Sequence, residues 1–233
     1  IDEGLVGSEM CIRDRFFALH VVALPLMLIA LVFMHLVALH EVGAGNPEGI
    51  DIEKHLDDDG IPLDSVPFFP YKVLNALVGI GVFGTVFAIF MFFFPEGGGY
   101  FIEAPNFEEA NPLSTPEHIA PVWYYSPYYS MLRAVPDKLG GFVVMAAAVA
   151  ILFVVPWLDR SKVNSIRYKG IWSKIAILLF AVSFITLGYL GTVPVTEIRT
   201  LMSIICTIIY FSFFLLMPIY TSFEKTSVPP ERL

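Results

Sequence analysis

Five long apolar segments run along the chain and are separated by more polar connections. They occupy residues 16–39, 73–94, 142–158, 171–190 and 200–220, and the third, which is the shortest, can extend back to Leu139. A helix needs about 20 apolar residues to cross a bilayer, and it satisfies its own backbone hydrogen bonds there. The pattern therefore predicts an all-α fold, a polytopic bundle of five transmembrane helices.

The composition agrees with a membrane protein and excludes several other classes. Hydrophobic residues make up 56% of the 233 residues and charged residues only 15%, whereas a soluble domain carries about a quarter charged residues. A soluble globular enzyme and a disordered chain are therefore excluded. The net charge of -8 also argues against a nucleic-acid partner, because binding nucleic acid needs clustered positive charge.

The basic residues predict how the bundle is oriented. Cytoplasmic loops carry an excess of Lys and Arg, and the connection after the third segment holds four: Arg160, Lys162, Arg167 and Lys169. This side is therefore expected to be cytoplasmic, with the amino terminus outside and the carboxy terminus inside. The connection 95–138 then lies outside, and its length and aromatic content predict a structured, functional loop.

Two histidines lie inside the first apolar segment, where ionisable residues are rare and usually functional. His20 and His35 are 15 residues apart, which in a regular α-helix gives about 60° of rotation and about 22 Å of rise. They share one broad stripe near opposite membrane faces and cannot bind one metal together. Two stacked iron macrocycles could each take one axial imidazole. The alternative is two isolated histidines that form hydrogen bonds or a proton relay.

Pro25 and His40 add two further expectations for this segment. Pro25 lies between the two histidines, where it removes one backbone hydrogen bond and is expected to kink the helix. His40 is five residues past His35, about 140° round the helix, so it points away from the stripe. At the cytoplasmic interface a neutral imidazole can exchange a proton near physiological pH, and the alternative is an ordinary interfacial histidine.

Motifs in a fixed order along the chain indicate a family. They are RFFALH at 15–20, Pro25, HLVALHE at 35–41, Gly43, NPEG at 46–49, FPY at 69–71, ANPL at 110–113, TPEHI at 115–119, PVWY at 121–124 and LRAVPDKLGG at 132–141. Together they resemble cytochrome b of a bacterial type, the haem-bearing subunit of ubiquinol–cytochrome c reductase. The resemblance covers about residues 15–233, and this stretch is similar to the second half of a family member.

The resemblance implies roles for the two histidines inside the first apolar segment. His20 becomes an axial ligand of the low-potential b-type haem near the outer face, and His35 serves the high-potential b-type haem near the inner face. Each haem needs a second histidine from the family's second helix, which this chain lacks. The 15-residue spacing is one longer than the mitochondrial pattern and is similar to the photosynthetic counterpart.

The outer loop resembles the family's quinol-oxidation site. Pro121, Trp123 and Tyr124 are expected to shape the pocket, while Val122 replaces the motif's usual glutamate. Because quinol oxidation releases protons and a carboxylate is a suitable acceptor, Glu117 is the candidate substitute; the alternative is a solvated loop residue. Another tyrosine, Tyr129, matches one that hydrogen-bonds at the docking surface of the iron–sulfur protein.

The inner face resembles the family's quinone-reduction site, represented by His40. Ala44 stands where a serine is usual, and Asn75 and Ala76 align with a usual Lys-Asp pair. An amide can hydrogen-bond a quinone carbonyl but cannot supply a proton at neutral pH. The aspartate of the usual route of proton delivery is therefore missing at position 76.

Taken with the resemblance, the expected function is electron transfer from quinol through two b-type haems to quinone, coupled to proton translocation. The implied partners are a Rieske-type iron–sulfur protein, a c-type cytochrome, the missing N-terminal half and membrane lipid, in a homodimeric complex of the bacterial inner membrane. The alternative function is a non-redox membrane protein, a transporter or structural subunit, with a histidine relay.

The chain itself is expected to be a fragment that is inactive alone. Residues 1–14 match neither the family pattern nor a targeting signal and are read as aberrant. Residues 15–41 form the haem-ligand helix, and residues 42–233 form the C-terminal region with four transmembrane helices and the quinol-oxidation loop 95–138.

Overall fold

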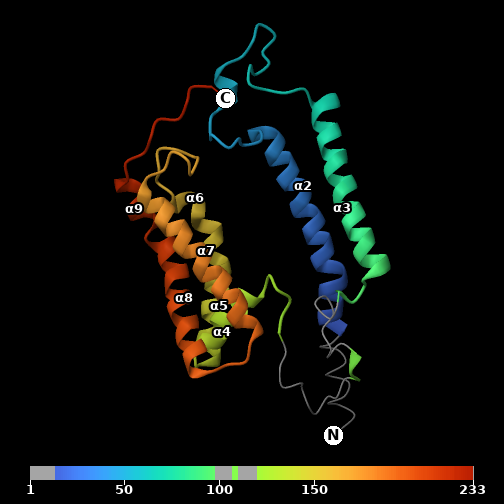
Figure 1. The fold of residues 1–233 in the computed structure, drawn as a ribbon, viewed down its shortest axis with the longest axis vertical. Helices are drawn as coiled ribbons and strands as arrows, with labels where there is room; N and C mark the ends of the chain where they lie inside the picture. The colour runs from blue at the N-terminus through green and yellow to red at the C-terminus, as the bar shows by residue number, and fades with distance from the viewer. Residues whose placement is uncertain (1–13, 98–106, 110–119, 233) are drawn as a thin grey trace. The chain divides into compact units, whose positions relative to one another are not determined.

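The computed structural model describes residues 14–97, 107–109 and 120–232. Within these residues the chain is helical, and its one β-type pairing is an isolated bridge between Leu56 and Pro62. Five helical stretches are long and apolar enough to cross a membrane: Asp14–Val42, Phe68–Phe93, Lys138–Leu158, Ile171–Thr192 and Glu197–Leu215. The predicted all-α fold with five spanning helices is confirmed (Figure 1).

The chain divides into two units, Ile1–Pro47 and Glu48–Leu233. The first unit contains the π-helical turn η1 (Leu19–Ala23) and the helix α2 (Leu24–Val42). Helix α2 ends at Gly43, which has a φ of 80° and donates its N–H to the Leu39 carbonyl at 2.8 Å. A glycine adopts this positive φ without the steric penalty of a Cβ, so it ends the helix here.

The second unit begins with a polar loop and one spanning helix. The loop includes η2 (Ile52–Lys54), and η3 (Phe68–Lys72) leads into α3 (Val73–Phe93). Helix α3 ends at Phe93, and the next residue, Phe94, immediately precedes Pro95 and is not helical. A residue that precedes proline is disfavoured in the α conformation, which accounts for this boundary.

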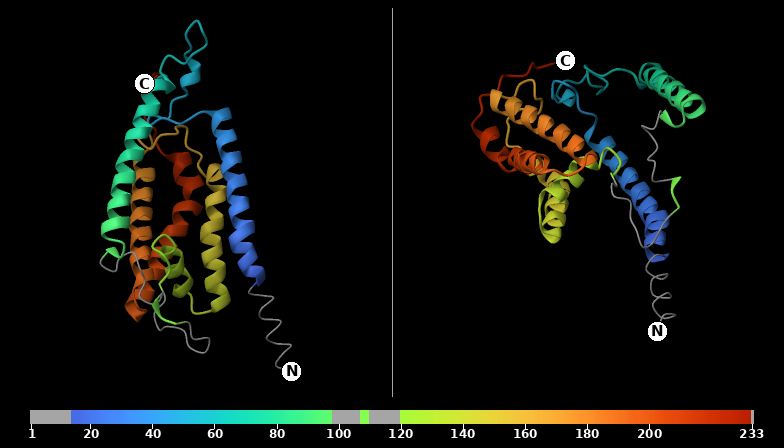
Figure 2. Two further views of the ribbon diagram at one scale, coloured as in Figure 1. Left: turned by 90° about the vertical axis from the view of Figure 1, so that its right-hand side faces the viewer. Right: turned by 60° about the horizontal axis from the view of Figure 1, so that its bottom comes forward.

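The rest of the second unit forms a bundle of packed helices. Its elements are α4 (Ser126–Ala134), α5 (Lys138–Ala150), η6 (Ile151–Val154), α6 (Val155–Leu158), α7 (Ile171–Thr192), α8 (Glu197–Leu215) and α9 (Met217–Phe223). Helix α4 packs against α5, α7 and α8, and α7 runs beside α8 (Figure 2). The buried core comprises Met131, Ala148, Leu187, Tyr210, Phe214 and Met217. Helix α4, which lies in the predicted outer loop, is thus a structural part of the bundle.

Two glycines let α4 approach its neighbours closely. A Cβ built on Gly191 of α7 would lie 2.2 Å from the Ser126 carbonyl oxygen, and one on Gly141 of α5 would lie 2.4 Å from the Leu132 carbonyl oxygen. Any larger residue would collide with the α4 backbone at both positions. A buried hydrogen bond of 2.9 Å between the Ser130 and Ser203 hydroxyls also joins α4 to α8.

The third spanning helix is not one regular helix. It passes from α5 through the 3-10 segment η6 into α6, where Pro156 occupies the first turn. Proline cannot donate the backbone hydrogen bond that would continue the regular helix, which accounts for the irregular stretch before it. Just ahead of that stretch, the Ala148 carbonyl accepts a hydrogen bond of 2.8 Å from the Tyr210 hydroxyl of α8. This contact satisfies a buried tyrosine hydroxyl and joins α8 to α5.

The fifth span differs from its predicted limits of 200–220. The helix begins at Glu197, because the Thr196 side chain caps it by accepting from the Arg199 N–H at 3.3 Å. It ends at Leu215, and α9 follows with Pro218 in its first turn. The predicted last residues therefore belong to a separate short helix, which the proline starts.

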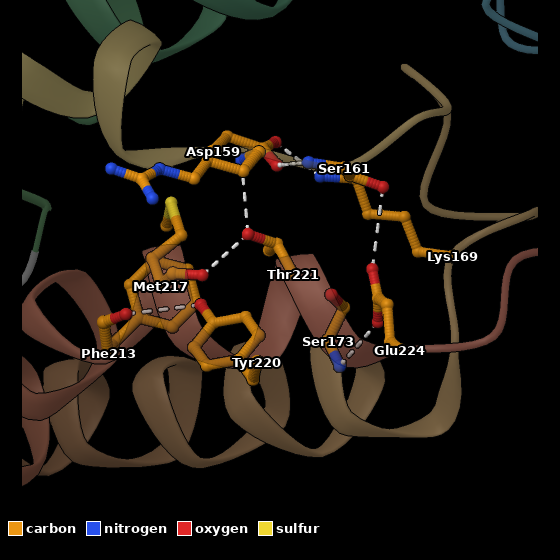
Figure 3. A network of polar contacts seen from close by, with 10 residues as sticks. Asp159, Ser161, Lys169, Ser173, Phe213, Met217, Tyr220, Thr221 and Glu224 are labelled. Atoms are coloured by element: carbon orange, nitrogen blue, oxygen red, sulfur yellow. Dashed lines mark hydrogen bonds and ion pairs between the residues drawn. The ribbon is translucent and has the colours of Figure 1, made fainter.

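A polar network joins α9 to the start of α7 and to the 159–170 loop (Figure 3). Helix α7 has no side-chain cap of its own at Gly170. Glu224 takes that role: its carboxylate accepts from the Ser173 N–H at 3.3 Å and from the Ser161 hydroxyl at 3.4 Å. An acidic group is favourable at a helix N-terminus because the unpaired N–H groups carry partial positive charge. The Glu224 carboxylate therefore holds the end of α9, the start of α7 and the 159–170 loop together.

Candidate functional site

The three histidines of the first span lie on one continuous helical stretch, as the sequence predicts. His20 is in the turn η1, while His35 and His40 are in α2. All three side chains are exposed within the unit. The structure does not bring His20 and His35 together, and within the described ranges no group of three or more metal-ligating side chains occurs. Any metal at these positions must therefore be bound by each histidine separately.

The His40 imidazole has a defined orientation. Its Nδ1 lies 2.8 Å from the Leu36 carbonyl oxygen, one turn back along α2. A carbonyl oxygen only accepts hydrogen bonds, so Nδ1 carries the proton in this contact. In the neutral ring, Nε2 is then the free acceptor, and protonation at Nε2 turns it into a donor. The geometry suits a residue that exchanges a proton through Nε2.

The residues predicted for the quinol-oxidation pocket form a tight turn ahead of α4. The Tyr125 N–H donates to the Val122 carbonyl at 2.9 Å, and the buried Ser126 hydroxyl donates to the Pro121 carbonyl at 3.4 Å. Trp123 projects from this turn, is 81% exposed and meets the Tyr124 ring edge-on, with the ring centroids 5.5 Å apart. The turn is anchored on α4 and presents an aromatic surface.

Tyr129 lies one helical turn into α4 and is partly buried. The guanidinium carbon of Arg133 lies 4.6 Å from the centre of its ring, which is a cation–π contact. The same guanidinium donates to the carbonyls of Leu190 at 2.5 Å and Val193 at 3.2 Å. Those carbonyls lie at the end of α7, where a cation is favoured. Arg133 thus joins Tyr129 to α7.

Sequence reasoning assigned no role to Arg133, although it lies in the motif at 132–141. The available signal was a cation placed among apolar residues close to a predicted span. Sequence reasoning also proposed Glu117 as a proton acceptor. Glu117 lies outside the described residues, so its position stays a prediction.

A second polar contact joins the loop after α2 to the loop before α7. Glu48 accepts hydrogen bonds from the Arg167 guanidinium and the Tyr168 hydroxyl. The hydrogen bond to this carboxylate is the main cause of a raised pKa for the Tyr168 hydroxyl. Gly49, which has a φ of 70°, lies so close to the loop before α7 that a Cβ added to it would be 2.8 Å from the Ser165 backbone nitrogen. The NPEG motif is therefore also a packing motif, which the sequence did not reveal.

Within the second unit, the chain's last described residues make a further loop contact. The Asp64 carboxylate accepts from Arg232 at 3.2 and 3.3 Å, and this bond raises the pKa of the guanidinium. The Tyr168 carbonyl accepts from the Ser227 N–H at 2.8 Å. The chain's last described residues therefore hold the 48–66 loop to the bundle.

Comparisons with known proteins agree with the motif order. The family model described as "Cytochrome b(N-terminal)/b6/petB" matches residues 2–127, and the one described as "Cytochrome b(C-terminal)/b6/petD" matches residues 109–211. Both halves of the family are therefore represented. The prediction that the resemblance is to the C-terminal half alone is not supported, because the N-terminal model matches more than half of the chain.

Individual relatives give the same result. "Cytochrome b" of Allochromatium vinosum is 53% identical over 228 residues, which are 94% of this chain and 55% of the relative. "Cytochrome b" of Yarrowia lipolytica is 39% identical over 91% of this chain and 52% of the relative. A chain of the solved structure "Hyperthermophilic respiratory Complex III" superposes with a TM-score of 0.79 at 37% identity, covering 91% of this chain and 51% of that one. The chain spans about half the length of the relatives it matches.

Proposed function

The chain belongs to the cytochrome b family, and we propose that it is the part of a quinol–cytochrome c oxidoreductase that binds two b-type haems and quinone. In this role it takes part in electron transfer from quinol to quinone that is coupled to proton translocation. The observation that carries the proposal is the pair His20 and His35, 15 residues apart on one apolar helix of 29 residues. At 1.5 Å per residue the pair is separated by about 22 Å, most of the hydrocarbon thickness.

The donor set fits two haems better than any single metal. Neutral imidazoles are ordinary axial ligands of haem iron, and in the described part of the chain neither His20 nor His35 forms a side-chain hydrogen bond that occupies a ring nitrogen. When bound, the haems supply one-electron transfer across the membrane. The protein's part is to place one imidazole near each membrane face. We assign the second axial histidine of each haem to another helix of the assembled complex.

We assign the turn before α4 to quinol oxidation. Pro121, Trp123 and Tyr124 shape the pocket wall, since their turn is anchored by the buried Ser126. Tyr129, held by Arg133, faces the docking surface of the iron–sulfur protein and donates its hydroxyl there. Val122 has no proton-accepting group, so a carboxylate elsewhere must take the protons that quinol releases.

Glu117 is the proposed proton acceptor at this site. Glu117→Gln should lower the rate of quinol oxidation and shift its pH profile, because an amide cannot accept the proton. Glu109→Gln is the matched control, since that carboxylate is exposed in the same loop and has no proposed role. Equal rates and equal pH profiles for the wild type and Glu117→Gln would exclude the assignment.

We assign His40 to quinone reduction at the opposite face. With Nδ1 directed at the Leu36 carbonyl, Nε2 is the atom that can hand a proton to a quinone oxygen. Ala44 and Ala76 provide no polar side chain at two positions where the family resemblance places a serine and an aspartate. His40 therefore carries more of the proton delivery here than in a site with an added carboxylate.

The proposed setting is a multi-pass protein of the bacterial inner membrane. Its partners are a Rieske-type iron–sulfur protein and a c-type cytochrome, in a homodimeric complex with surrounding lipid. Support comes from the similarity to a chain of a respiratory Complex III and to bacterial cytochromes b. The basic loop 159–170 sets the orientation, since it favours the cytoplasmic side.

The proposal is tested by reduced-minus-oxidised spectroscopy of the complex in its membrane. His20→Ala and His35→Ala should each remove one of two b-type haem signals and leave the other. His55→Ala is the matched control, because His55 lies in the exposed loop that contains η2 and should change neither signal. An unaltered spectrum in both span variants would refute the haem assignment.

A further inference from the structure

The helix that carries both histidines contains one wide turn. Across η1 the Leu24 N–H donates to the Leu19 carbonyl, five residues back, rather than to His20 four residues back. The rest of the stretch from Leu24 to Val42 is α-helical. Such π turns are rare, and they occur mostly as single turns inserted in α-helices. The rotation worked out for a regular α-helix therefore does not hold across this one turn.

The cause of the wide turn is local. Pro25 lies directly after it, in the first turn of α2. In a regular helix its ring would collide with the Val21 carbonyl, and its missing N–H would leave that carbonyl unpaired. The proline and its neighbours in sequence account for the wide turn.

The wide turn changes the rotation between the histidines. A π turn takes one residue more than an α turn to close, so it absorbs about 100° of rotation. Because His20 is the second of the five residues of η1, most of the wide turn lies between the two histidines, and their 15 residues advance nearly as far round the axis as 14 residues of regular α-helix. The angle round the helix axis between His20 and His35 then shifts from about 60° in one direction of rotation toward about 40° in the opposite direction.

We propose that Pro25 is a positioning residue for the haem pair, because the π turn that it imposes sets the direction of the His20 imidazole relative to His35. The inference rests on the proposed haem function and deepens it. The extra residue of the 15-residue spacing is absorbed in the turn, so both imidazoles face the same side of the helix as a 14-residue pair does. His20 thereby meets its haem without a change in the remainder of α2.

Three variants of the assembled complex test this inference. Pro25→Ala allows a regular helix with 15-residue spacing, so the signal of the His20 haem should be lost or its electron paramagnetic resonance line shifted. Deletion of Val22 in the Pro25→Ala background gives a regular helix with 14-residue spacing, and it should restore that signal. Deletion of Val22 with Pro25 retained should again disturb the signal of the His20 haem. The wide turn would then form in a helix whose histidines are only 14 residues apart, so the two imidazoles would no longer face the same side.

The His35 haem is the internal control for assembly in every variant. Haem content per complex is the second measurement, and it does not depend on turnover. A Pro25→Ala variant with two wild-type signals would overturn the inference. If Pro25→Ala loses both signals, the double variant decides: recovery supports the inference, and no recovery overturns it. If His20→Ala itself leaves both signals intact, the haem assignment fails, which is distinct from failure at Pro25 alone.

Discussion

Replacing Gly191 by alanine tests whether the contact between α4 and α7 holds the quinol-oxidation turn in place. The new Cβ would lie 2.2 Å from the Ser126 carbonyl oxygen and 2.7 Å from its carbonyl carbon. Real Cβ atoms essentially never approach another heavy atom within 3.0 Å. The obstructing atoms are backbone, so a side-chain rotation cannot relieve the collision and α4 must move away by about 0.8 Å.

The expected cost is larger than the gain in helix propensity. Overpacking in a close-packed interior costs about 1–3 kcal/mol, while replacing glycine by alanine inside a helix gains at most about 1 kcal/mol. Gly191 lies in the last turn of α7, which reduces that gain. We expect a loss of about 2 kcal/mol, which corresponds to a thermal midpoint about 4–8 °C lower for a chain of this size.

Gly188 provides a matched control on the same helix. A Cβ there meets only the Pro127 side chain, at an ordinary distance of 3.7 Å. Gly188→Ala should therefore leave the thermal midpoint of the detergent-solubilised complex unchanged or raise it. Quinol oxidation should fall in Gly191→Ala and not in Gly188→Ala, because the Pro121–Tyr124 turn is anchored on Ser126. Equal midpoints and equal rates for the two variants would refute the reasoning.

Three further outcomes are expected. Glu48→Gln should lower the pKa of Tyr168 toward 10.0, since the hydrogen bond to the carboxylate raises it; ultraviolet titration against Tyr168→Phe measures this. Because the pKa of Tyr168 is raised in the folded protein, its hydrogen bond to Glu48 stabilises the fold fully below pH 10 and is lost as the pH rises through the raised pKa. The difference in stability between the wild type and Tyr168→Phe should therefore vanish above that pKa. Glu224→Gln should lower the unfolding free energy by about 0.5 kcal/mol, because a negative charge leaves the start of α7; no change relative to the exposed control Glu231→Gln would contradict it. Arg133→Lys should cost about 1 kcal/mol in thermal unfolding, because an ammonium group cannot reach both carbonyls at the end of α7 as the planar guanidinium does; an unchanged midpoint would count against this role.

The spans were predictable because each one is a local property of the sequence. Long apolar runs need backbone satisfaction in the membrane, and helices provide it within the segment itself. The helix limits were less predictable, as the fifth span shows: Thr196 capped it earlier than expected and Pro218 started a new helix. Such limits depend on single side-chain hydrogen bonds, which a hydropathy window does not resolve.

The candidate site divides in the same way. The spacing of His20 and His35 and the order of the family motifs are readable along the chain, because they need no knowledge of what packs against them. The π turn was missed even though Pro25 was noted, because a proline can be accommodated by a kink or by a wider turn. Only the backbone hydrogen bond from Leu24 to Leu19 distinguishes the two.

The sequence by itself determined that this protein is a five-span helical membrane protein with one histidine near each end of the first span. Hydrophobic runs and residue spacing carry that information, since both act within a single segment. The tertiary structure alone decided which residues far apart in sequence support one another, such as Arg133 with the end of α7 and Glu224 with its start. Those contacts join segments more than 50 residues apart, and no local pattern records such a pairing, because either partner alone looks like an ordinary charged residue.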